Sequence, residues 1–292
     1  MEPAIILENA QVRATFKTTG AELTSLIHKG NELEYIWQAD PQIWNRHAPV
    51  LFPIVGKLKN DTYSYRNDWF RLSQHGFARD LEYELEGLTE DALKFVLNHS
   101  EKTLVHYPFK FKLVIGYKLK ATTLTVSYEV FNESEEPLFF SIGAHPAFRC
   151  PLTDKGKFED YYLEFNEAET LERHLLTDGV FDGTTEVVMD NANILPLTYE
   201  LFEKDALVFK KFKSNTVTLK SRKEPRGLKV SFPGFPYLGI WTKQKGAPFI
   251  CIEPWYGLAD STNTSGDLVE KEGVMKLEPA EEFDCHYQIE IF

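Results

Sequence analysis

Three short segments of this chain place polar side chains inside otherwise apolar runs, each where a strand is expected to end. They offer the following groups: His75 and Arg79 in residues 74–80, His145 in residues 139–148, and Glu253 in residues 249–257. Imidazole and carboxylate groups are the side chains that most often move protons in enzymes, and arginine donates hydrogen bonds to ligands. The segments therefore point to acid–base chemistry or to ligand binding.

Glu253 is the strongest of these candidates. It is the only charge in the run Phe-Ile-Cys-Ile-Glu-Pro-Trp-Tyr, and the aromatic residues Trp255 and Tyr256 follow it. Burying a carboxylate among such neighbours costs on the order of several kcal/mol unless it is paired or protonated, so buried carboxylates are enriched at functional sites. The alternative is that Glu253 is an edge residue that faces solvent. An aromatic ring beside an isolated carboxylate can also stack on the apolar face of a sugar.

The other candidates indicate a functional site only when they are considered together. A single histidine near a strand end, such as His75 or His145, is more often structural than functional. Arg46 precedes the apolar stretch 50–55, and with Arg79 it could hold a substrate, although one arginine is usually a solvated surface charge.

Several common chemistries lack the groups that they need. The chain has no Gly-rich phosphate loop, no Gly-x-Gly-x-x-Gly fingerprint and no Gly-x-Ser-x-Gly elbow. Its eight histidines include no pair at helical or zinc-finger spacing, so a metal site would have to be assembled from distant strands. We therefore expect no metal and no cofactor.

The elements that must position these groups are mostly strands. Period-two alternation predicts strands in residues 11–16, 62–72, 92–97, 111–119 and 123–131, and apolar runs predict others at 206–209, 228–232, 238–242, 249–253 and 287–292. Turn signals stand at residues 29–31, 67–68, 178–179 and 182–183. The only helix candidate is a turn or two at residues 199–205. This pattern predicts an all-β protein, a sandwich or barrel.

Length and composition predict one large domain. The 292 residues are 43% hydrophobic and 14% aromatic, enough to bury a large core, and no repeat or Pro-, Gly- or Ser-rich linker divides them. We expect a single β-sandwich domain spanning residues 1–292.

Charge and targeting signals limit the partners. The formal net charge of −12 disfavours nucleic acid and anionic membranes, but it does not exclude a small anion held by local cations. Residues 1–10 carry no Lys or Arg and too short an apolar run for an export signal, and no window resembles a membrane helix. Three cysteines without close spacing are expected to be free thiols, so a cytoplasmic location is expected.

The segments in this order resemble the aldose 1-epimerase (galactose mutarotase) family, and most closely its LacX-like branch. The resemblance rests on the run Ala-Pro-Val-Leu-Phe-Pro-Ile-Val-Gly-Lys at 48–57, His-Gly-Phe-Ala-Arg at 75–79, His-Pro at 145–146 and Glu-Pro-Trp at 253–255. It spans essentially the whole chain. It implies the family's large antiparallel β-supersandwich and a cofactor-free interconversion of the α and β anomers of a sugar.

The resemblance also implies roles for individual residues. Glu253 matches the family's base for the anomeric hydroxyl, His145 its acid for the ring oxygen, and His75 its other sugar-binding histidine. Asp205 is placed like the family's sugar-binding aspartate. A nearby carboxylate is expected to favour the imidazolium form of His145.

One departure bears on the substrate. Galactose-specific members carry Gly-Arg-x-x-Asn-Arg, whereas this chain reads Gly-Lys-Leu-Lys-Asn-Asp at 56–61. Arg46 or Arg79 could substitute for the missing arginine, as in hexose-phosphate relatives. Three alternatives to a hexose epimerase therefore stand: a hexose-6-phosphate epimerase, a sugar-binding module without catalysis, and, least favoured, a glycoside hydrolase, which usually needs two carboxylates.

Overall fold

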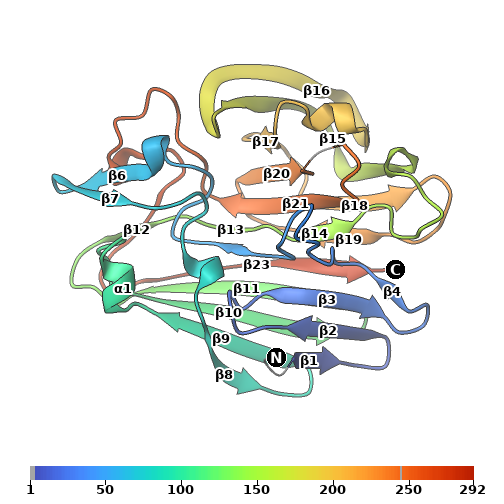
Figure 1. Ribbon diagram of the computed structural model, residues 1–292, viewed down its shortest axis with the longest axis horizontal. Coiled ribbons are helices and arrows are strands. Elements are labelled where there is room, and N and C mark those ends of the chain that lie inside the picture. The colour runs from blue at the N-terminus through green and yellow to red at the C-terminus, as the bar shows by residue number, and fades with distance from the viewer. Residues whose placement is uncertain (1–3, 244) are drawn as a thin grey trace.

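The computed structural model describes residues 4–243 and 245–292, so residues 1–3, part of the segment inspected for an export signal, lie outside it. A nine-stranded sheet, in which every strand runs antiparallel to its neighbours, forms the back layer in Figure 1. Its strands are, in order across the sheet, β16 (Val180–Pro196), β15 (Tyr161–Thr177), β18 (Thr216–Ser221), β19 (Leu228–Ser231), β23 (Glu282–Ile291), β11 (Thr123–Asn132), β10 (Phe111–Lys120), β9 (Ala92–Asn98) and β8 (Glu84–Leu88).

Two smaller antiparallel sheets form the front layer (Figure 1). The first contains β1 (Ile5–Glu8), β2 (Val12–Phe16), β3 (Leu23–His28) and β4 (Leu33–Glu34). The second, called the site sheet below, has the order β17 (Leu207–Phe209), β20 (Tyr237–Trp241), β21 (Phe249–Tyr256), β13 (Ile142–Ala144) and β5 (Val50–Leu51), with β14 (Ala147–Arg149) also paired to β21. The antiparallel β-sandwich predicted from the sequence is confirmed.

The remaining elements are short and lie at the edges of the layers. They are the pairs β6 (Thr62–Tyr65) with β7 (Asp68–Arg71) and β12 (Leu138–Phe140) with β22 (Met275–Leu277), the α-helix α1 (Glu101–Leu104), and the 3₁₀ turns η1 (Lys59–Asp61), η2 (Ala78–Asp80), η3 (Phe158–Asp160), η4 (Tyr199–Phe202) and η5 (Leu268–Glu270). No helix in residues 4–243 or 245–292 is long and apolar enough to cross a membrane.

The main core fills the space between the layers, and its aromatic rings join them. Phe16 on β2 packs on Tyr117 of β10 with ring centroids 4.4 Å apart, and Phe52 next to β5 packs on Phe111 at 5.0 Å. The Tyr117 hydroxyl also donates to the carbonyl oxygen of Ala21 at 2.7 Å. Because both front sheets are packed on the same back sheet, their outer faces share one surface of the molecule.

The local predictions succeed where alternation is strong and fail where a turn signal lies inside a strand. The hairpin expected at residues 62–72 is present as β6 and β7, and the helix candidate at 199–205 contains the 3₁₀ turn η4. The turn predicted at Asp182-Gly183 is wrong, since both residues lie within β16. There the Asp182 carboxylate accepts hydrogen bonds from the Thr184 amide and hydroxyl, and the β15–β16 register shifts nearby, so the signal marks a strand irregularity.

A tight turn at His75-Gly76 is fixed against the backbone beside β5. Both residues have positive φ, at 68° and 70°. The amides of Phe77 and Ala78 donate to the carbonyl oxygen of Phe52 at 3.1 and 3.2 Å. A β-carbon at Gly76 would lie 2.3 Å from that same oxygen, so this position requires glycine for space as well as for conformation.

We expect Gly76→Ala to lower the free energy of unfolding by at least about 3 kcal/mol, because the left-handed conformation and the clash both act against it. Gly183→Ala is the matched control: its φ is also positive, at 89°, but no atom lies within 4 Å of an added β-carbon. The control should lose only about 1–2 kcal/mol. Urea denaturation of both variants measures the difference, and equal losses would show that the Phe52 contact is unimportant.

Candidate active site

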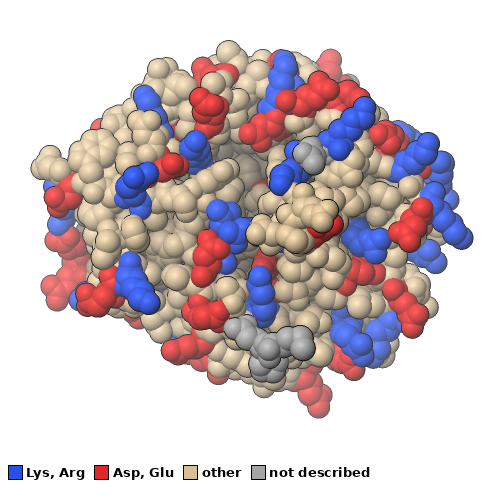
Figure 2. Space-filling model, viewed as in Figure 1, with Lys and Arg blue, Asp and Glu red and all other residues tan. Residues whose placement is uncertain are grey.

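A cavity of about 450 Å³ opens on the outer face of the site sheet, away from the main core. Figure 2 shows the hollow near the centre of this face, with Lys and Arg side chains around it. All six residues selected from the sequence line it: Arg46, His75, Arg79, His145, Asp205 and Glu253. The tertiary structure therefore brings together groups that are separated by up to 207 residues in the chain.

Strand β21 sets the floor of the cavity because its side chains alternate between two faces. Ile250 and Ile252 point into the main core, whereas Cys251, Glu253 and Trp255 share the opposite face. Glu253 is only 1% exposed, and it lies in the middle of its strand rather than at the strand end expected from the sequence.

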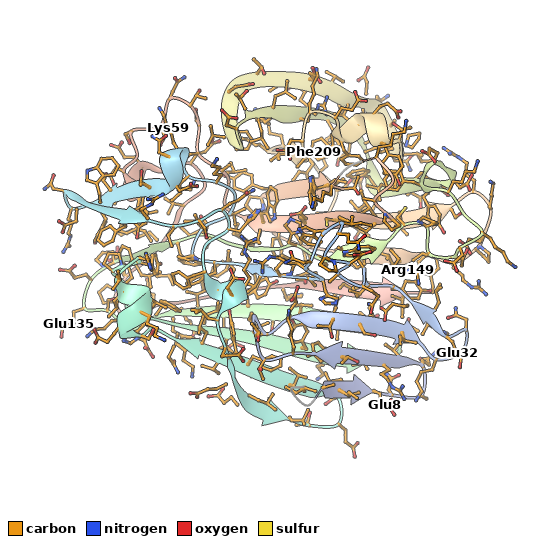
Figure 3. All side chains as sticks on the ribbon, in the orientation of Figure 1. Glu8, Glu32, Lys59, Glu135, Arg149 and Phe209 are labelled. Atoms are coloured by element: carbon orange, nitrogen blue, oxygen red, sulfur yellow. The ribbon has the colours of Figure 1, made fainter. Side chains whose placement is uncertain are left out.

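Apolar groups surround the carboxylate on the same face. One apolar cluster, which includes Trp255, lies on one side of it, and another, which includes Phe249 and Cys251, lies on the other. On β17 the same alternation places Val208 on the cavity and Phe209, labelled in Figure 3, in the main core.

His145 lies between β13 and β14, which both pair with β21, and it faces Glu253 from there. It follows directly after β13, where Pro146 interrupts the strand, and its Nε2 lies 3.1 Å from Oε2 of Glu253. Within the described residues, neither Oε2 of Glu253 nor Nδ1 of His145 has a hydrogen-bond partner of good geometry, although both atoms are buried. Two buried polar atoms are therefore left for a ligand to satisfy.

Aromatic rings hold the imidazole of His145 in place. Trp44 stacks on it with centroids 5.1 Å apart, and Trp241 and His75 meet it edge-on, each at 5.6 Å. Rings packed on several sides fix the orientation of an imidazole without using its nitrogen atoms. The ring is thus held by packing, and its Nε2 is left to face Glu253.

The protonation state favoured for His145 and Glu253 differs from the one expected from the sequence. Burial lowers the pKa of His145 to about 3, and the positive charges of Arg79 and Arg46 act in the same direction. Burial also raises the pKa of Glu253 well above its usual range, and the negative charge of Asp205 adds to that effect. The expectation of a favoured imidazolium is therefore wrong for the substrate-free site, because desolvation of both charges outweighs their attraction.

His75 is held in one tautomer by its own turn. Its Nδ1 accepts a hydrogen bond from the Gly56 amide at 3.1 Å, and its own amide donates to the carbonyl oxygen of Gly56 at 2.9 Å. Burial, with the neighbouring His145, lowers the pKa of His75 well below its usual value. A neutral imidazole whose Nδ1 accepts must carry its proton on Nε2, so His75 is set to donate one hydrogen bond.

Three cations line the cavity, one of which the sequence analysis did not select. Arg46 pairs with Asp80 at 2.9 Å, and Arg79 donates to the carbonyl oxygen of Gln74 at 2.6 Å. The third cation is Lys243, which donates to the backbone of Ile43. Burial lowers the pKa of Arg79 to about 10, and the positive charge of Arg46 acts in the same direction, whereas the carboxylates of Asp80 and Glu22 oppose it.

The loop that carries Arg46 is tied to the first front sheet by Glu22. This carboxylate is 2% exposed, and its Oε1 accepts the amides of His47 and Ala48 at 2.8 and 2.9 Å. Its other oxygen pairs with Lys17. Glu22 is thus a positioning residue for the loop, and sequence reasoning missed it because its neighbours in the chain carry no motif.

The tip of the β15–β16 hairpin forms another wall of the cavity. Phe181 lines the site, and its amide donates to the carbonyl oxygen of Asp260 at 2.8 Å. The carboxylate of Asp260 accepts from the Lys59 amide and from the buried ammonium of Lys271, each at 2.9 Å. This buried pair fixes the hairpin tip and residues 57–59 relative to the cavity.

Comparison with known proteins agrees with this fold. The sequence profile of the aldose 1-epimerase family matches residues 3–276. The chain is 39% identical over 296 aligned residues to Protein LacX, chromosomal, of Lactococcus lactis subsp. lactis, an alignment that covers 98% of this chain and 99% of LacX. The chain therefore belongs to the aldose 1-epimerase family, as its sequence motifs suggest.

Solved structures give the same result. A galactose mutarotase related enzyme from Lactobacillus acidophilus matches with a TM-score of 0.95 at 35% identity, covering 99% of this chain and 97% of that one. A galactose mutarotase-like protein from Lactobacillus casei matches with a TM-score of 0.94 at 32% identity, covering 99% and 100%. The fold is thus galactose mutarotase-like.

We expect the His145 imidazole to remain neutral in the sugar-free protein from pH 8 down to about pH 4, because its pKa is lowered to about 3. Nitrogen-15 NMR of the histidine rings measures this directly. Loss of the signal in His145→Gln assigns it, and a histidine peptide, whose pKa is about 6.5, is the reference. A His145 signal that titrates near pH 7 would contradict the expected effect of burial.

Proposed function

We propose that this protein is an aldose 1-epimerase that interconverts the α and β anomers of a hexose. The observation that supports this most directly is the buried pair of His145 and Glu253, whose facing atoms lie 3.1 Å apart at the floor of a sugar-sized cavity. Mutarotation removes one proton from the anomeric hydroxyl and adds one to the ring oxygen. Both oxygens are bonded to one carbon, so a close acid–base pair can serve both.

The pair can work in either protonation form. With a carboxylate and an imidazolium, Glu253 is the base for the anomeric hydroxyl and His145 is the acid for the ring oxygen. The neutral pair favoured in the substrate-free site carries the same number of protons with the roles exchanged. Ring closure on the opposite face of the carbonyl reverses both transfers and returns the pair to its starting form.

The surrounding residues would bind and orient the sugar. His75 would donate from Nε2 to a sugar oxygen, and Asp205, at the exposed end of the cavity, would accept from a hydroxyl. Trp255, whose indole nitrogen donates to the carbonyl oxygen of Ala144 at 3.2 Å, offers a fixed ring for the apolar face of the sugar.

We expect Glu253→Gln to lower the rate of catalysed mutarotation by about 10²- to 10⁴-fold, because an amide cannot exchange the proton. Polarimetry with freshly dissolved α-galactose and α-glucose measures the rate above the uncatalysed background. Glu129→Gln, on the outer face of β11, is the matched control and should retain the rate. Full activity of Glu253→Gln would remove Glu253 from the mechanism, and binding of sugars without any turnover by the unaltered protein would favour the non-catalytic module.

A hexose 6-phosphate is a second candidate substrate, favoured by the cations of the cavity. Nε of Arg79 is buried and has no hydrogen-bond partner within the described residues, and Arg46 and Lys243 lie on the same cavity. An anionic group would satisfy that donor and offset the local positive charge. The side chain of Lys57, in the segment that departs from the galactose-specific pattern, is instead directed toward Gly179.

For a phosphorylated substrate, we expect Arg46→Ala to raise KM for glucose 6-phosphate by about 10- to 100-fold, since a hydrogen bond to a charged group contributes about 1.5–3 kcal/mol. KM for glucose should change little. Parallel mutarotation assays on the two sugars give the comparison. A similar change in KM for both sugars would show that Arg46 does not bind the phosphate.

A further inference from the structure

One side chain at the floor of the cavity has no part in the proposed proton transfers. Cys251 lies two residues before Glu253 on β21, so its thiol is on the same face of the strand as the carboxylate. It is fully buried and free. His145, Cys251 and Glu253 each offer a ligand atom, and these three atoms lie within 4.8 Å of one another.

This set of atoms matches the ligand preferences of zinc. Zinc takes nitrogen, sulfur and oxygen ligands at about 2.0–2.3 Å, so tetrahedral ligand atoms stand about 3.3–3.7 Å apart. The facing atoms of His145 and Glu253 are already 3.1 Å apart, and the widest separation in the group needs to close by only about 1 Å. Magnesium and calcium, which prefer oxygen ligands, would not use the thiol.

The site also contains the free electron pairs that a metal needs. Oε2 of Glu253 is buried without a hydrogen-bond partner in the part of the chain that is described, and Nε2 of His145, which faces it at 3.1 Å, is the imidazole nitrogen that can bind an ion between them. Three protein ligands leave a fourth position, and that position faces the cavity because His145 and Glu253 line it. The apolar residues Ala147 and Phe249 belong to the same buried cluster as Cys251.

We propose that His145, Cys251 and Glu253 form a binding site for one thiophilic divalent cation, of which zinc is the type. The ion binds as the thiol and the carboxyl lose their protons. With the metal in place, neither His145 nor Glu253 can exchange a proton with a sugar. The cation is therefore an inhibitor that competes with the substrate, and this last consequence rests on the proposed epimerase function.

Cobalt(II) tests the binding independently of activity, because a thiolate bound to cobalt gives an intense near-ultraviolet absorption band. We expect one equivalent of Co²⁺ per chain to produce this band in the unaltered protein and one equivalent of Zn²⁺ to remove it. Cys251→Ala should abolish the band and weaken Zn²⁺ binding, measured by competition with a chromophoric chelator, by at least about 100-fold. Cys150→Ala and Cys285→Ala, which also replace buried free cysteines, are the matched controls. They should keep both the cobalt band and the affinity for Zn²⁺.

Two results would overturn the site: no thiolate band in the unaltered protein, or a band that persists in Cys251→Ala. The unaltered protein provides the first readout, so the test does not depend on whether the variant folds. If the protein catalyses mutarotation, Zn²⁺ should inhibit it, excess chelator should restore it, and Cys251→Ala should be resistant. A cobalt band in a protein without mutarotase activity would support the metal site and reject the proposed function, so the two failures are distinguishable.

Discussion

The site depends on the burial of one carboxylate in a strand whose two faces serve different purposes. Glu253 is held in β21 between residues that pack into the main core, so the strand cannot turn its side chain toward solvent. Desolvation then raises the pKa of the carboxyl and, beside it, lowers that of His145. The result is a buried carboxyl and a buried imidazole that are both neutral before a ligand binds, with their facing atoms 3.1 Å apart.

The rest of the structure keeps this pair at the floor of an open cavity. The turn at His75 is tied to the backbone of Gly56 and Phe52, and the Arg46 loop is tied to Glu22. The buried pair of Asp260 and Lys271 fixes the opposite wall. The first two anchors are backbone amides meeting buried acceptors, and the third is a buried ion pair; such contacts resist displacement because a lost partner would leave a polar group unsatisfied.

Local charge around the site differs in sign from the charge of the molecule. The chain carries a formal net charge of −12, yet Arg46, Arg79 and Lys243 line the cavity. Salt screens the distant negative charges within about 10 Å, so a ligand in the cavity responds mainly to these three cations. Below these cations, burial raises the pKa of both Glu253 and Cys251, so the floor of the cavity carries little negative charge of its own.

The sequence by itself determined the strand pattern, the motifs of the family and six of the residues that line the cavity, because alternation and isolated polar groups are local properties. It did not reveal Trp44, Trp241, Lys243 or Glu22, whose roles come from contacts between distant segments. Nor did it predict the protonation of the pair: a carboxylate beside an imidazole suggests an ion pair until the burial of both is known. That burial is decided only when the sheets pack, since desolvation depends on the neighbours in space and not on the neighbours in the chain.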